Sequence, residues 1–188
     1  LVRDGDSMSL ILRPDPEFLN DPSTVYPVTI DPATARLANV FDTYVQQGEK
    51  TDHSSDTELD WGDPGTTNTD GSARSARSFI TWNTAPIANA LVSKAALGLW
   101  NTHSGNTDCK PAQWQVWDTS KASTASRWTS QPTWTEKFAS PTTTTGRAAC
   151  DDADGWITAD VTDMLQTWAS ANIKTSGMGL RAPDEGDA

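Results

Sequence analysis

Short runs in which apolar and polar residues alternate recur along the chain, separated by clusters of glycine, proline, asparagine, aspartate, serine and threonine. A period of two places successive side chains on opposite faces of a strand. Several such runs with turn residues between them are typical of an all-β sandwich or barrel. The predicted strands are 7–12, 25–30, 40–46, 76–83, 92–101, 112–118, 155–161 and 176–182.

One stretch follows a different period. Within residues 161–171, apolar side chains recur at the i, i+3, i+4 and i+7 spacing that lines one face of a helix. Asp160 or Thr162 is available as the cap at its start. The pattern therefore predicts one short helix over about 161–171.

The N-terminal part of the chain has a different composition. Residues 14–27 are rich in proline, which cannot donate to a sheet ladder. Residues 1–33 are therefore predicted to be edge strands or a lead-in from an upstream module, and residues 34–188 to be the sandwich. Long polar loops are expected at 53–75 and 121–146. Because the opening residues lack both methionine and the regions of a signal peptide, we expect a mature fragment or a piece of a longer protein.

The two cysteines, Cys109 and Cys150, both lie in polar, loop-like surroundings. Such surroundings differ from the apolar settings of structural free thiols, so we expect a disulfide. Closing a loop of about 40 residues would add roughly 4 kcal/mol of stability on the loop-entropy account. A disulfide indicates an oxidising compartment and hence a secreted or cell-surface protein. The alternative is a cytosolic protein with two unpaired surface thiols.

The charge balance bears on the choice of partner. The formal net charge is -11, and the 14 lysines and arginines are scattered along the chain. Nucleic acid and anionic membrane surfaces need a concentrated positive field, so neither is expected as a partner. No apolar run of about 18 residues is present, so no membrane insertion is expected either.

Catalytic motifs are scarce. His53 and His103 are the only histidines, and each lies in a polar turn where we expect a solvated side chain without a partner. No metal-binding histidine pair, nucleophile elbow or phosphate-binding loop occurs. Paired carboxylates for glycoside hydrolysis are recognised only in the folded protein, and in a chain this acidic we expect them to be solvated. The candidates are Glu58, Asp60, Glu136, Asp184 and Glu185. The chain is therefore predicted not to be an enzyme.

Acidic residues also offer sites for a structural calcium ion, which binds carboxylate and carbonyl oxygens. Residues 150–156 begin like a calcium loop but lack its closing glutamate, so a simple Asx-turn is the alternative there. The candidate ligands are Asp42, Asp152, Asp154, Asp160, Asp184 and Glu185.

The nine tryptophans divide into two groups. Trp82, Trp114 and Trp168 share a face with other apolar residues and are predicted to lie in the core. Trp100 and Trp117 each end a strand whose inward positions are already filled, so both are expected on an outer face.

An outward indole is either covered by another part of the protein or left bare to bind a ligand. The loop at 119–147 offers such a cover, and the strands 92–101 and 112–118 would be neighbours if they form a hairpin. A sugar platform is the alternative, because pyranose rings pack their C–H faces on indole. The platform candidates are Trp61, Trp117, Trp128 and Trp134.

A series of motifs in fixed order resembles the DNRLRE domain family. The motifs, which span about 26–187, are YPVTIDPA, FDTYVQ, ARSFITWNTAPI, VSKAALGLW, RWTSQPTW, WITADVTDMLQTW and GMGLRAPDEGD. The resemblance implies a jelly-roll-like antiparallel β-sandwich that serves as a non-catalytic module of large secreted or surface bacterial proteins. Some of these proteins carry RHS or YD repeats. Certain members look like carbohydrate-binding modules, in some cases stabilised by calcium.

Two departures from this family pattern are present. The pattern usually continues beyond the APDE motif into another strand, so the sandwich is expected to lack its final strand and to present an edge for association. Many relatives also lack the predicted disulfide. The leading hypothesis is a module that binds polysaccharide or cell-surface glycan on behalf of a longer polypeptide. The alternatives are a structural spacer or docking domain in a surface or toxin-delivery protein and, third, a glycan-active enzyme.

Overall fold

Antiparallel strands dominate the computed structural model, which describes residues 2–4, 7–9, 15–28, 34–105, 108–183 and 185. The chain divides into two compact units, Leu1–Thr34 and Ala35–Ala188. Within the first unit, β1 (Val2–Asp4) pairs with β2 (Ser7–Ser9), and α1 (Pro16–Asn20) follows. The origin of the first 33 residues in an upstream module stays a prediction.

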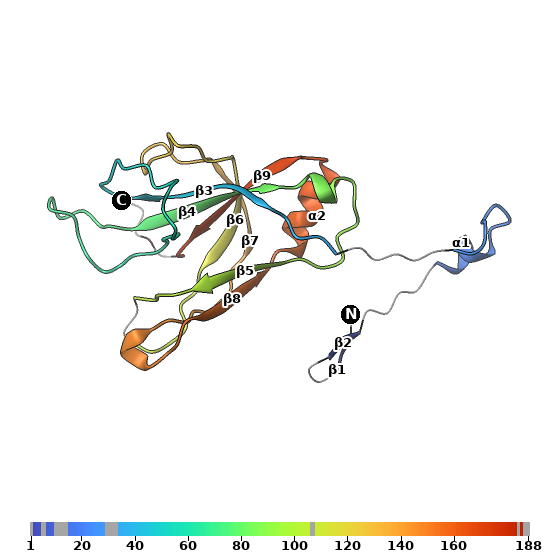
Figure 1. The fold of residues 1–188 in the computed structure, drawn as a ribbon, viewed down its shortest axis with the longest axis horizontal. Coiled ribbons are helices and arrows are strands. Elements are labelled where there is room, and N and C mark those ends of the chain that lie inside the picture. The colour runs from blue at the N-terminus through green and yellow to red at the C-terminus, as the bar shows by residue number, and fades with distance from the viewer. Residues whose placement is uncertain are drawn as a thin grey trace. The chain divides into compact units, whose positions relative to one another are not determined.

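The second unit contains two antiparallel sheets (Figure 1). The larger sheet has the strand order β3-β4-β9-β6-β7, and β5 pairs with β8 in a separate two-stranded ribbon. The strands are β3 (Asn39–Gln46), β4 (Ala76–Asn83), β5 (Ala96–Asn101), β6 (Gln115–Thr119), β7 (Trp134–Ala139), β8 (Gly155–Asp160) and β9 (Thr175–Arg181). Two 3-10 turns, η1 (Ala85–Ile87) and η2 (Ala148–Cys150), and the helix α2 (Thr162–Ser170) complete the unit.

A single core joins the two sheets and the helix. It contains Ile80 and Leu180 from the large sheet, Ile157 from the ribbon, and Met164 and Trp168 from α2. Burial of apolar side chains from every layer provides the main stabilisation of such a sandwich. The predicted all-β sandwich with one short helix in this region is confirmed.

The first residue of the helix α2, Thr162, is held by the polar side chain of Asp160, two positions before it. One carboxylate oxygen of Asp160 accepts hydrogen bonds from the amide of Thr162 at 2.9 Å and from its hydroxyl at 2.6 Å. The carboxylate thereby satisfies an amide that the first turn leaves unpaired. The predicted apolar face, with Met164 and Trp168 buried, is confirmed. The predicted cap is wrong, because the N-cap residue is Val161, whose side chain has no polar atom that could accept a capping hydrogen bond.

Several predicted strands need correction. The segment 25–28 forms a bend and not a strand, since Pro27 lacks the amide hydrogen that a ladder needs, and 29–30 lie outside the described residues. The strand predicted over 7–12 is observed only as Ser7–Ser9, and residues 10–12 lie outside the description.

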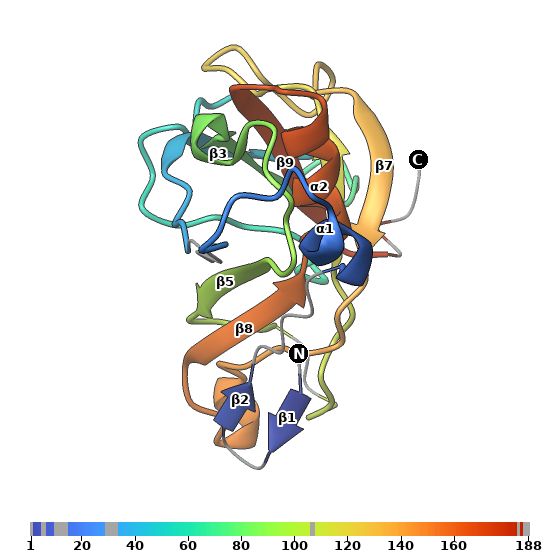
Figure 2. The same cartoon turned by 90° about the vertical axis from the view of Figure 1, so that its right-hand side faces the viewer.

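Strand pairing also differs from expectation. The hairpin considered between 92–101 and 112–118 does not form: β5 pairs with β8, whereas β6 lies between β7 and β9. The long loop expected at 121–146 contains the edge strand β7. Figure 2 shows β5 and β8 as a ribbon, with the orange turn of η2 beyond the start of β8.

Candidate functional site

Two tryptophans lie exposed on one rung of the β5–β8 ribbon. Trp100 and Trp156 are directly opposite each other in the register, and their exposed fractions are 53% and 68%. Their ring centroids are 5.5 Å apart with an interplanar angle of 80°. All nine tryptophans belong to described residues, and these are the only two that are exposed. We call them the exposed tryptophan pair.

Alternation along the two strands explains this exposure. Leu97 and Ile157 point into the core, with exposed fractions of 4% and 1%. The residues between the inward positions therefore point outward. The outward set consists of Ala96, Gly98 and Trp100 on β5 and of Trp156, Thr158 and Asp160 on β8. Because the other members are short, nothing on the ribbon's own face covers the two indoles.

The sequence placed Trp100 on the outer face, and the structure confirms it. Trp156 is not among the residues predicted to lie on an outer face, although the same signal is present in its strand. Ile157, Ala159 and Val161 are the apolar positions of its strand, and their alternation assigns Trp156 to the opposite face.

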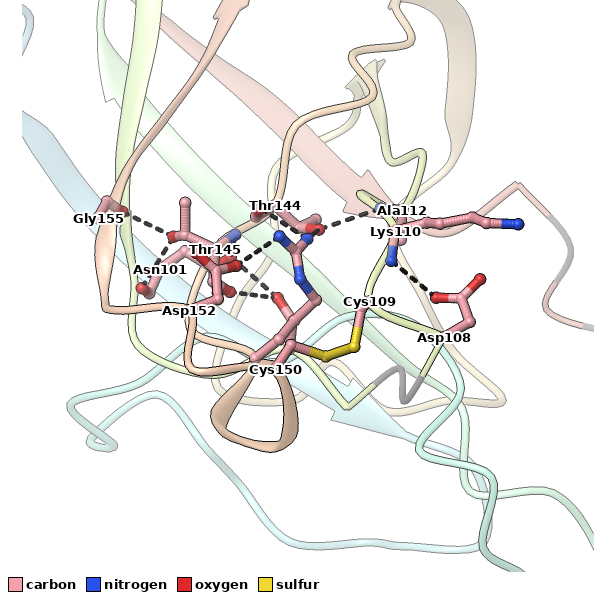
Figure 3. Close-up of polar contacts among 12 residues, drawn as sticks. Asn101, Asp108, Cys109, Lys110, Ala112, Thr144, Thr145, Cys150, Asp152 and Gly155 are labelled. Atoms are coloured by element: carbon pink, nitrogen blue, oxygen red, sulfur yellow. Dashed lines mark hydrogen bonds and ion pairs between the residues drawn. A yellow bond between two sulfur atoms is a disulfide. The ribbon is translucent and has the colours of Figure 1, made fainter.

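A network of hydrogen bonds fixes the end of the ribbon next to the pair (Figure 3). The buried side-chain oxygen of Asn101 accepts from the amide of Thr145 at 2.9 Å. The Thr145 hydroxyl lies 3.3 Å from the carbonyl oxygen of Gly155 and 3.4 Å from that of Asn101. A third segment of chain thus connects the last residue of β5 with the first residue of β8.

The predicted disulfide is confirmed at the same end. Cys109 and Cys150 are bonded, with their Cα atoms 5.5 Å apart. The bond joins the loop after β5 to η2, which precedes β8, as Figure 3 shows. The loops at this end of the ribbon are therefore covalently linked.

An ion pair lies beside the disulfide. The guanidinium of Arg147 contacts the carboxylate of Asp152 at 2.5 Å, and its Nη1 donates to the carbonyl oxygen of Thr144 at 2.9 Å. Asp152, a candidate calcium ligand, is thus engaged with an arginine.

The other calcium candidates lie in separate surroundings. Asp42 accepts from Asn39, Asp160 accepts from Thr162, Asp154 is exposed, and Asp184 is outside the described residues. Within the described ranges, no three His, Cys, Asp or Glu side chains form a group that could hold a metal ion. Because calcium also accepts carbonyl and water oxygens, a calcium site built on fewer carboxylates stays a prediction.

Three of the four predicted platform residues meet on the large sheet. Trp117 and Trp134 are in edge contact, with centroids 6.0 Å apart. Arg181 lies 4.6 Å from the centroid of Trp117, and Arg77 lies 4.5 Å from that of Trp128. We call these five residues the arginine–tryptophan layer. All three of its indoles are partly buried, and guanidinium groups pack on Trp117 and Trp128.

Trp61, the fourth candidate, lies elsewhere. Its ring packs against the buried Trp114 at a centroid distance of 5.8 Å, at the margin of the core. A role for Trp61, Trp117, Trp128 or Trp134 in sugar binding stays a prediction.

The catalytic candidates are scattered among different roles. Glu58, Asp60 and Glu136 are exposed. Glu185 is 5% exposed, pairs with Arg77 at 2.5 Å and accepts from the amide of Ala182 at 2.7 Å. Its burial raises the pKa of the Glu185 carboxyl above the usual value, against the opposing effect of Arg77.

The expectation of a solvated, unpartnered His53 is wrong. Its Nδ1 lies 2.7 Å from a carboxylate oxygen of Asp56, and its ring stacks on Tyr44 at 4.0 Å, which leaves it 8% exposed. Burial and the nearby carboxylates of Asp60 and Asp56 raise the pKa of Tyr44 to about 12. The spacing of residues in the sequence does not predict the contact with Tyr44, because Tyr44 belongs to the strand β3 and His53 to the loop that follows it. His103 is exposed, as expected.

In the described part of the chain, no helix has both the length and the apolar character needed to cross a bilayer.

Comparison with known proteins supplies the family. No curated protein matches the sequence. The profile of carbohydrate-binding module family 96 matches residues 33–187, which covers nearly all of the second unit and most of the chain. The chain therefore belongs to carbohydrate-binding module family 96.

Proposed function

We propose that this chain is a non-catalytic module that binds carbohydrate through the exposed tryptophan pair. The observation that carries the proposal is the position of Trp100 and Trp156 on one rung of an uncovered sheet face. Exposed indoles cost free energy in water unless they serve an interaction, and the flat C–H faces of pyranose rings are suited to pack on them.

The surroundings of the pair supply polar groups for a sugar. Thr158 and Asp160 follow Trp156 on the same face of β8, and both are exposed. Their hydroxyl and carboxylate oxygens can accept hydrogen bonds from sugar hydroxyls, and the threonine can also donate. Apolar contact with indole and a few polar contacts at the edge form the usual combination in a ligand site.

The arginine–tryptophan layer supports this choice indirectly. The guanidinium of Arg181 packs on the indole of Trp117, and that of Arg77 packs on Trp128. A sugar would have to displace those cations before it could stack there. We therefore assign this layer a structural role and place sugar binding on Trp100 and Trp156.

The wider context of the module is also part of the proposal. The resemblance to DNRLRE domains, some of them in proteins with RHS repeats, favours a module of a larger extracellular bacterial protein. The disulfide between Cys109 and Cys150 agrees with an oxidising location. In that setting the module would hold the rest of the polypeptide on a glycan.

The test is binding to a panel of soluble neutral and acidic polysaccharides, followed by gel retardation and tryptophan fluorescence. Trp100→Ala and Trp156→Ala should each weaken binding about tenfold, since stacking on an aromatic ring contributes about 0.5–1.5 kcal/mol beyond the burial of its area. Leu91→Ala is the matched control, because Leu91 is 89% exposed and lies outside the ribbon. Circular dichroism checks that each variant is folded.

Two results would contradict the proposal in different ways. Loss of binding in Trp117→Ala or Trp128→Ala, with both ribbon variants unaffected, would move the site to the arginine–tryptophan layer. Absence of binding to every polysaccharide would favour the spacer or docking role.

A further inference from the structure

The mutual orientation of the exposed tryptophan pair restricts the kind of ligand that it can bind. The two ring planes meet at 80°, so they cannot both lie flat against one extended sugar chain. The flat surface of a crystalline polysaccharide can stack only on aromatic rings that lie in one plane. The pair therefore has the wrong geometry for a flat platform.

Gly98 shows how one of the rings is oriented. It is a diagonal neighbour of Trp156 across the ladder, because Gly98 pairs with Thr158. A Cβ atom on Gly98 would lie 3.7 Å and 3.8 Å from two carbons of the six-membered ring of Trp156. The indole thus leans over the bare backbone at Gly98, with its other face toward solvent, in agreement with its 68% exposed fraction.

Trp100 lies beside the ring of Trp156. Its centroid is 5.5 Å from that of Trp156, and its plane is nearly perpendicular. At this distance and angle the two indoles are in edge-to-face contact with each other. A sugar that stacks on the solvent face of Trp156 would therefore meet Trp100 with its rim.

We infer that Trp156 and Trp100 form a right-angled corner that holds a single pyranose unit, with Trp156 as the floor and Trp100 as the wall. The inference rests on the proposed function and adds the size of the recognised unit. The ligand class is a short oligosaccharide or one end of a glycan chain. Gly98 is a positioning residue, because a Cβ there would already contact the Trp156 ring and a branched side chain would displace it.

A stabilising role alone would also explain an edge-to-face pair, since cross-strand aromatic pairs strengthen sheets. That role predicts changes in melting temperature but no dependence of affinity on the length of a sugar chain. Chain length is therefore the decisive readout.

The experiment uses oligosaccharides of one to six residues cut from whichever panel polysaccharide binds, with affinities from calorimetry. A corner for one unit predicts that affinity per molecule reaches its plateau by the disaccharide, within about threefold of the hexasaccharide. An affinity that keeps rising through four to six residues would overturn the corner and leave the proposed function intact. If no polysaccharide in the panel binds, both fail together.

Substitutions at Gly98 test the orientation of the floor. Gly98→Ala adds a Cβ at ordinary contact distance and should weaken binding slightly, by about two- to threefold, whereas the branched side chain of Gly98→Val should lift the Trp156 ring and weaken binding about tenfold. Valine favours strands, so both variants should fold, and their melting temperatures check this. Trp156→Ala should also cost more affinity than Trp100→Ala. Equal affinity of the alanine and valine variants, or a larger loss at Trp100, would refute the assignment.

Discussion

The guanidinium of Arg181 lies 4.6 Å from the ring centroid of Trp117 and covers an indole that strand alternation places on the outer face of its sheet. The two side chains also share a hydrogen-bond acceptor. The side-chain oxygen of Gln115 accepts from Trp117 Nε1 at 2.8 Å and from Arg181 Nε at 3.2 Å. The outward tryptophan is therefore covered by a neighbouring strand and an adjacent polar side chain, and no ligand is needed to explain it.

Removal of this cover should expose Trp117. Arg181→Ala should increase the quenching of tryptophan fluorescence by acrylamide and lower the free energy of unfolding by about 1 kcal/mol, the size of a cation–π contact. Arg181→Lys should recover only part of the loss, because an ammonium lacks the planar fork of arginine. Sugar binding should not change, since the proposed site is on the ribbon.

Arg36→Ala serves as the control for the lost positive charge, because Arg36 is exposed at the start of the second unit. It should alter neither quenching nor stability. Unchanged quenching in Arg181→Ala would show that another part of the protein covers Trp117.

The disulfide is expected to contribute much of the stability of the second unit. Cys109 and Cys150 are separated by 41 positions, for which the loop-entropy account gives about 4 kcal/mol. The double variant Cys109→Ser with Cys150→Ser should therefore unfold at a distinctly lower denaturant concentration. Urea denaturation followed by circular dichroism provides the measurement.

A reductant separates the bond from the side-chain changes. It should lower the unfolding midpoint of the original chain toward that of the serine variant, and it should have no effect on the variant itself. If the fully reduced chain keeps its midpoint, then the hydrogen bonds among Asn101, Thr145 and Gly155 are sufficient to hold this end of the ribbon.

Alternation of apolar residues predicted most of the sheet but not its pairing. The strand predicted over 76–83 coincides with β4 (Ala76–Asn83), because its apolar residues repeat clearly and polar turns flank it. In contrast, the residues of β7 (Trp134–Ala139) fall within a segment whose composition predicts a loop. Its Glu136 and Lys137 are exposed at a sheet edge, where charged side chains are common and alternation is weak.

The candidate site depended on information that local patterns do not contain. The period of each strand was enough to place Trp100, and also Trp156, on an outer face. Their meeting on one rung depends on the pairing of β5 with β8, which are distant in sequence. Nothing in the residues 92–101 alone specifies that partner.

The hydrogen bonds between Thr162 and Asp160 at the start of α2 should make the stability of the fold depend on pH. Hydrogen bonds from the hydroxyl and the amide of Thr162 lower the pKa of Asp160 below its ordinary value of 3.8. The carboxylate therefore stabilises the fold fully above that value, and its contribution is lost as the pH falls through the lower folded pKa. The effect should be small, because the group is exposed.

Asp160→Asn keeps an oxygen acceptor but cannot titrate. The difference in unfolding midpoint between the original chain and this variant should be constant from pH 7 to about 5 and should shrink between about pH 4 and 2. Asp163→Asn removes a charge from the same first turn and is the control. A difference that stays constant down to the lowest pH would contradict the assignment.

A partly buried hydrogen bond should couple α2 to the large sheet. Trp168 Nε1 donates to a carboxylate oxygen of Asp118 at 2.8 Å, and the indole is only 2% exposed. Trp168→Phe keeps an aromatic ring in the core but removes the donor, so the free energy of unfolding should fall by about 2–3 kcal/mol from the lost volume and the lost charged hydrogen bond. Asp118→Asn keeps the shape and removes the charge.

A double-mutant cycle on these two residues isolates their interaction. We expect a coupling energy of about 1 kcal/mol or more in urea denaturation, because each single variant already removes the charged hydrogen bond. Thr135→Val is the control on the other side of the carboxylate: it deletes a 2.6 Å hydrogen bond to Asp118 at an exposed position, and it should cost less than Trp168→Phe. Additive effects of Trp168→Phe and Asp118→Asn would mean that packing, and not this hydrogen bond, holds the helix against the sheet.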